Sequence, residues 1–107
     1  MNKSEIYVIK REDTYYTPAN AMRKKVTYNE KAFEDPNIAK GYVDKIRESI
    51  ISTTKFDILL DGIKEYDEKN NIIYERRIKL VEKMNYNTKM QLHVVSIEAI
   101  PFVPNKG

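Results

Sequence analysis

The chain of 107 residues has no cysteine, a single histidine and only three glycines. Without cysteine there is no disulfide, no thiol nucleophile and no cysteine-based zinc site. Gly41, Gly62 and Gly107 lie too far apart to form a phosphate-binding loop. No apolar run is long enough to span a bilayer, and the first residues lack the apolar core of a signal peptide. We therefore expect a cytoplasmic protein of one domain, residues 1–107, without a membrane segment or a cofactor.

Charge is plentiful and unevenly distributed along the chain. Residues 1–31 carry seven basic and four acidic groups, residues 32–68 carry five and nine, and residues 69–89 carry six and two. An acidic central segment thus lies between two basic ones. Charge segregated in this way can complement the surface of a partner, and it says little about the fold.

One helix is predicted with clear boundaries. Asp35 suits the N-cap position, and Pro36 suits the first helical position because its missing N–H would be unpaired there. The residues that follow keep helical spacing on one apolar stripe, which comprises Ile38, Ala39, Tyr42, Val43, Ile46 and Ile50. The helix should run over residues 36–51, and Gly41 weakens it, unless a close approach to the sheet requires a glycine there.

Short runs of β-branched and aromatic residues predict strands at 5–10, 14–17, 24–28 and 90–102. We expect Glu12 and Asp13 to turn the chain between the first two of these strands. A further turn is expected at residues 85–88, which are rich in asparagine.

Residues 56–84 allow two interpretations. A long helix over 55–84 keeps Phe56, Leu60 and other apolar residues roughly in one phase. A β-hairpin is the alternative, because Asn70 and Asn71 beside Asp67 are poor in a helix and favourable in a turn. We favour the hairpin.

The predicted fold is therefore α+β, a mostly antiparallel sheet with the helix packed on one face. Its expected core comprises Ile6, Val8, Phe33, Ile38, Tyr42, Val43, Ile46, Ile50, Leu60, Ile78, Leu80, Leu92, Val94 and Ile97.

Catalytic candidates are few. His93 has no second histidine to share a metal with, so a structural role is favoured for it. Asp57, Asp61 and Glu65 would share one face of either a helix or a regular strand. With His93 they could serve a small metal-dependent hydrolase, but no ligand-loop spacing is present. We expect no catalytic residue and no metal site.

Basic and aromatic residues offer a binding surface. Tyrosine rings stack on unpaired bases and basic side chains neutralise phosphates, so a sheet that presents both can hold single-stranded nucleic acid. The candidate binding residues are Tyr15, Tyr16, Lys24, Lys25, Arg76 and Arg77. They belong to separate segments, so only the fold can bring them together.

Part of the chain resembles small uncharacterised proteins of phages and mobile elements of low-GC Gram-positive bacteria. The similarity covers residues 5–46 and rests on Tyr7-Val8-Ile9-Lys10, Tyr15-Tyr16, Lys31-Ala32-Phe33, Ala39 and Tyr42-Val43. It implies an accessory protein without catalytic residues, acting in the host cytoplasm. We expect such a protein to bind a macromolecule, with a host protein that it inhibits as the first candidate and single-stranded nucleic acid as the alternative.

Overall fold

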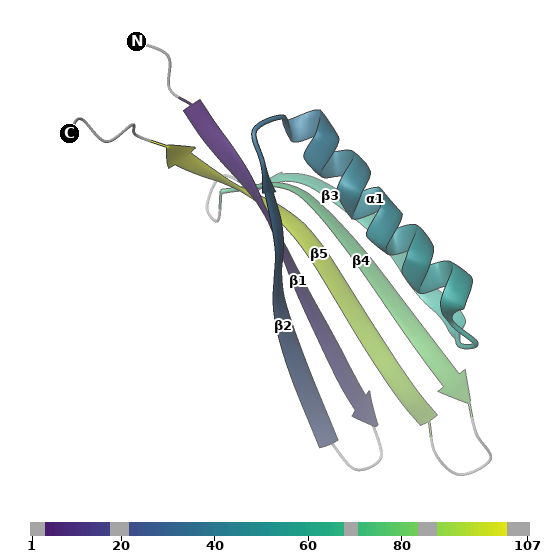
Figure 1. The fold of residues 1–107 in the computed structure, drawn as a ribbon. Helices are drawn as coiled ribbons and strands as arrows, with labels where there is room; N and C mark the ends of the chain where they lie inside the picture. The colour runs from purple at the N-terminus through teal and green to yellow at the C-terminus, as the bar shows by residue number, and fades with distance from the viewer. Residues whose placement is uncertain (1–3, 18–21, 68–70, 84–87, 103–107) are drawn as a thin grey trace.

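The computed structural model of the chain describes residues 4–17, 22–67, 71–83 and 88–102. Its elements follow in the order β1 (Ser4–Thr17), β2 (Met22–Phe33), α1 (Pro36–Thr53), β3 (Asp57–Asp67), β4 (Ile72–Lys83) and β5 (Thr88–Phe102). The strands form one antiparallel sheet in the spatial order β2-β1-β5-β4-β3, and α1 packs on one of its faces (Figure 1). The predicted α+β class is confirmed.

The molecule is elongated, with extents of 61 × 24 × 22 Å. The helix covers only part of its face, and β1, β2, β4 and β5 continue beyond its C-terminal end (Figure 1). The central pair of strands is β1 and β5, whereas β2 and β3 form the two edges. The edges matter for function, because the outer backbone groups of an edge strand have no neighbouring strand to bond.

The helix begins and ends close to the predicted boundaries. The Asp35 carboxylate accepts a hydrogen bond from the backbone N–H of Asn37 at 2.8 Å, and Pro36 occupies the first turn. At the other end the N–H of Thr54 bonds the carbonyl of Ile50 at 3.2 Å. A near-perfect match here follows from local chemistry, since both caps depend on neighbours in the sequence.

Successive strand residues point to opposite faces of the sheet, and paired residues point to the same face. We call the side covered by α1 the helix face; it carries Ile9, Ile78 and Val95, which are fully buried. The opposite side is the open face. On the helix face two clusters of buried residues form the core, one around Val43 and one around Ile50.

The core prediction is correct in part. Val43, Ile50, Ile78, Leu80 and Ile97 are buried, and Phe33, Tyr42 and Ile46 pack against them. Two predicted members, Ile38 and Leu60, are exposed. Four more lie half-buried on the open face: Ile6, Val8, Leu92 and Val94. The error is one of phase, because β1 and β5 carry apolar residues on both faces and the sequence does not show which face the helix covers.

The hairpin prediction for residues 56–84 is confirmed, and the long helix is excluded by the pairing of β3 with β4. Asn71 has a positive φ of 57°, a conformation that asparagine tolerates, and its carbonyl accepts the N–H of Ala99 at 2.9 Å. Residues 68–70 of the turn lie outside the described residues, as do residues 85–87 of the second predicted turn.

The expected turn at Glu12 and Asp13 is wrong. Strand β1 runs without interruption through both residues, because each finds partners on its two neighbouring strands. The short strand predicted at residues 24–28 is longer, extending over Met22–Phe33. Glu12 and Asp13 are consecutive strand residues that point to opposite faces of the sheet, and their polar side chains do not mark a turn.

Candidate interaction surface and buried polar network

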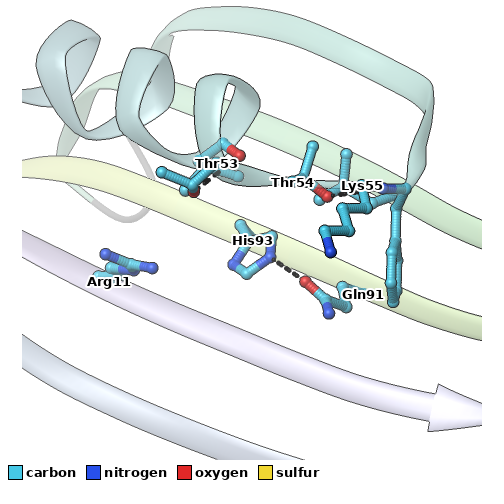
Figure 2. A pocket seen from close by; sticks show the side chains of 9 residues that line it. Arg11, Thr53, Thr54, Lys55, Gln91 and His93 are labelled. Carbon is cyan, nitrogen blue, oxygen red and sulfur yellow. Dashed lines mark hydrogen bonds between the residues drawn. The ribbon is translucent and has the colours of Figure 1, made fainter.

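A chain of polar side chains lies on the helix face where β1 pairs with β5. Nδ1 of His93 is 2.8 Å from an Asp13 carboxylate oxygen. Its Nε2 is 2.9 Å from the side-chain oxygen of Gln91, the contact drawn as a dashed line in Figure 2. Arg11 donates its Nε–H to both Asp13 oxygens, at 3.1 and 3.2 Å. The Asp13 side chain is only 1% exposed and that of His93 5%. Buried charge is therefore compensated within the network.

Two opposing effects act on the Asp13 carboxyl. Burial raises its pKa, but hydrogen bonds from His93 and Arg11 outweigh burial, so that the pKa lies below its ordinary value. Both ring nitrogens of His93 already have partners, and neither faces a reacting group. This arrangement supports the structural role that the sequence favoured for His93.

A pocket of about 370 Å³ opens beside this network, below the C-terminal end of α1 (Figure 2). It is lined by Arg11, Ile50, Thr53, Thr54, Lys55, Phe56, Leu80, Gln91 and His93. Its hydroxyls bond the local backbone: Thr53 donates to the carbonyl of Ser49 at 2.7 Å, and Thr54 accepts the N–H of Phe56 at 3.0 Å. The pocket therefore offers few polar groups that are not already hydrogen-bonded within the protein.

The acidic residues considered for a metal site do not converge. Asp61 lies on the helix face, where Arg47 and Arg76 bind it. A β-bulge between Ile58 and Leu60 changes the alternation, so that Asp57 points to the open face instead. Within the described part of the chain, no group of three or more histidine, aspartate or glutamate side chains could hold a metal ion.

A second polar cluster ties α1 to β4. The Tyr74 hydroxyl donates to Asp44 at 2.7 Å, and Arg76 Nε donates to the same oxygen at 3.2 Å. Burial and the hydrogen bond to Asp44 raise the pKa of Tyr74. For Asp61, the hydrogen bonds from Arg47 lower the pKa despite partial burial. These contacts tie the helix to β3 and β4 by polar side chains.

The six predicted binding residues are divided between the two faces. Tyr15, Lys24 and Arg76 lie on the helix face, and Tyr16, Lys25 and Arg77 lie on the open face. Arg76 is held by Asp44 and Asp61, Lys25 pairs with Glu12 at 3.2 Å, and Arg77 pairs with Glu75. Tyr15 and Lys24 are register partners on the helix face, and Tyr16 and Lys25 are diagonal neighbours on the open face of the same two strands, so no single face gathers more than three of the six residues.

Among the described side chains, the largest group of exposed large apolar residues lies on edge strand β3. Four aliphatic residues are about half exposed there: Ile58 (47%), Leu59 (54%), Leu60 (45%) and Ile63 (54%). Strand β4 occupies one side of β3, and within the described sheet no strand occupies the other. Apolar surface thus coincides with backbone groups that can pair with a further strand.

Sequence reasoning missed this surface because it assigned Leu60 to the core. The available signal was the run Ile58-Leu59-Leu60, in which apolar residues follow one another without alternation. A strand with one solvated face alternates apolar and polar residues, so this run indicates apolar side chains on both faces. The Asp13–His93 pair was missed because Asp13 was assigned to a turn.

Comparisons of the chain with protein-family models, with curated protein sequences and with solved structures found no match. Among the described residues, no helix combines the length and the apolar character needed to cross a bilayer. Functional inference therefore depends on the surface and the polar networks described above.

Proposed function

We propose that this protein is a non-catalytic binding protein, that its partner is a protein, and that β3 is the element that docks. The observation that carries the proposal is the exposure of Ile58, Leu59, Leu60 and Ile63 on an edge strand. An exposed apolar edge strand is a template for pairing with another chain, and folded proteins usually protect such edges.

The other edge of the same sheet provides the contrast. Strand β2 exposes Lys24, Lys25 and Lys31, and its one large exposed apolar side chain among those described is Tyr28. Lysines along an edge oppose pairing with further strands. Strand β3 has a single lysine, Lys64, within its bounds. The two edges thus differ in their lysines and in exposed apolar surface: β3 carries charged residues too, but it combines them with four exposed aliphatic side chains, which supports β3 as the docking element.

The alternatives draw less support from the geometry. Single-stranded nucleic acid would need the tyrosines and basic groups on one surface, whereas they are divided between two faces and partly engaged in ion pairs. A hydrolase would need His93 and the acidic residues together, and Asp57 and Asp61 point to opposite faces. An extended segment of a protein partner needs only the free edge.

A photo-crosslinking amino acid placed at Leu59 tests this proposal, with the same substitution at Tyr28 on β2 as the matched control. We expect covalent adducts with a protein, in the source-cell lysate or in the purified sample, from position 59 but not from position 28. The adducts should disappear when Leu60→Asp and Ile63→Asp are added. Equal adducts from both positions, or none from position 59, would overturn the proposal.

A further inference from the structure

We infer that β3 pairs with β3 of a second copy of this chain, antiparallel and about a two-fold axis at Asp61. The two five-stranded sheets would then form one continuous sheet with both helices on the same side. The inference rests on the proposed docking role of β3 and names its partner. It follows from the register that the side chains of this strand allow.

Facing directions restrict the possible registers. On β3, Ile58, Asp61 and Ile63 point to the helix face, while Asp57, Leu60, Gly62 and Lys64 point to the open face. A two-fold axis perpendicular to the sheet requires that residues on the same face oppose each other. With Asp61 on the axis, Leu60 lies opposite Gly62 of the other copy. If the bulge at Leu59 places two residues opposite one, Ile58 then lies opposite Ile63 and Asp57 opposite Lys64, and the two members of each pair point to the same face.

The side-chain sizes in this register are complementary. Ile58 of one copy lies opposite Ile63 of the other, so two cross-strand aliphatic pairs form on the helix face. Leu60 lies opposite Gly62 on the open face, where the absence of a side chain leaves room for it. Within one copy Leu60 Cδ1 already lies 3.7 Å from the position of a Cβ on Gly62, so the leucines of both copies would share the space over the two glycines. The four exposed aliphatic residues are thereby covered or brought close to the interface.

The charges are complementary as well. Asp57 lies opposite Lys64 of the other copy, twice by symmetry, and both point to the open face. The two Asp61 carboxylates meet near the axis, but Arg47 and Arg76 compensate each of them. Centring the axis on Ile63 would set Asp61 against Glu65, two carboxylates, and centring it on Gly62 would set Asp61 against Ile63. The axis at Asp61 avoids both mismatches.

Reversing charge at one position tests this register. We expect the purified chain to sediment as a dimer. Asp57→Lys sets a lysine opposite Lys64 of the other copy, and Lys64→Asp sets an aspartate opposite Asp57 of the other copy. Each change should weaken the dimer about tenfold. Mixed in equal amounts, the two variants should form a heterodimer, because every opposed pair is then of opposite charge. Lys31→Asp on β2 is the matched control and should leave the dimer unchanged.

A covalent test uses the cysteine-free background of the chain. Ile58→Cys and Ile63→Cys copies, mixed and oxidised, should give disulfide-linked heterodimers, whereas Tyr28→Cys on β2 should not. The inference would be overturned by a chain that stays monomeric up to about 1 mM, the weak end of specific association. A mass that keeps growing with concentration would also overturn it, because β3 would then pair with β2 of the next copy. If the chain is monomeric but position 59 still crosslinks to another protein, β3 keeps its docking role and only self-pairing fails.

Discussion

Asp13 and His93, on strands β1 and β5, are direct register partners, and their side chains meet at 2.8 Å in the interior. Arg11 lies on the same strand as Asp13 and donates to the same carboxylate, so a single Asp13 side chain binds both Arg11 and His93. The pair joins segments 80 residues apart in the chain. It therefore fastens the two central strands beside the C-terminal end of α1, where His93 lines the same pocket as Ile50 and Thr53.

Replacing Asp13 by asparagine should destabilise the fold by about 3–5 kcal/mol at neutral pH, because Arg11 loses its buried countercharge and His93 loses its contact with a buried carboxylate. Folding lowers the pKa of Asp13. The stability that the Asp13 carboxylate contributes is therefore complete above its pKa in the unfolded chain, about 4, and is lost as the pH falls through its pKa in the folded protein. The difference between wild type and Asp13→Asn in urea unfolding should therefore shrink below about pH 4.

Glu48→Gln is the matched control for this experiment. Glu48 is exposed on α1, and its substitution should change stability by no more than about 0.5 kcal/mol at any pH tested. Equal stability of Asp13→Asn and wild type at neutral pH would show that the buried network does not support the fold.

Truncation of two isoleucines separates the observed core from the predicted one. Ile78→Ala removes a fully buried side chain beneath α1 and should cost about 2–5 kcal/mol. Ile38→Ala, on the helix, removes a side chain that is 58% exposed and should cost much less. Thermal or urea unfolding of both variants measures the difference, and similar costs would contradict the assigned position of α1 on the sheet.

The turn before β4 depends on the backbone of Asn71. Because its φ is 57°, Asn71→Ala should cost about 1–2 kcal/mol, whereas Asn71→Gly should be nearly neutral. Urea unfolding of the two variants provides the comparison. An alanine variant as stable as the glycine variant would show that the left-handed conformation is not maintained.

Gly41 lies inside α1 with nothing within 4 Å of the position of a Cβ, so the close approach to the sheet considered from the sequence is not present. Gly41→Ala should consequently stabilise the protein by about 0.5–1 kcal/mol, since glycine loses more backbone freedom on folding than alanine does. The gain should appear as a rise in the urea midpoint of the variant. An unchanged or lower midpoint would show that a Cβ at position 41 does meet a neighbouring group.

Features set by neighbouring residues were predictable. The cap formed by Asp35 and Pro36 and the asparagine-rich hairpin both depend on chemistry within a few residues. Their locations follow from the sequence because no distant contact competes with them.

Features set by the phase of the strands were not predictable. Val94 and Val95 are equally apolar, yet Val95 is buried under the helix and Val94 faces the other side. A bulge that adds one residue between Ile58 and Leu60 reverses the facing of Asp57, and nothing in the composition marks that position. The sequence predicts that residues 57–67 belong to a β-hairpin, but it does not predict the order of the strands in the sheet. That order places β3 at the edge.

The pairing of β1 with β5 also decides when this protein can fold. Ser4 pairs with Phe102 and Tyr16 with Met90, so the centre of the sheet closes only between segments far apart in the chain. Such high contact order slows folding and keeps the sheet incomplete until β5 has been synthesised. Strand β5 lies between β1 and β4, so the apolar residues of both strands stay uncovered until β5 has been translated. We expect the nascent chain to be most prone to aggregation and to chaperone binding during this interval.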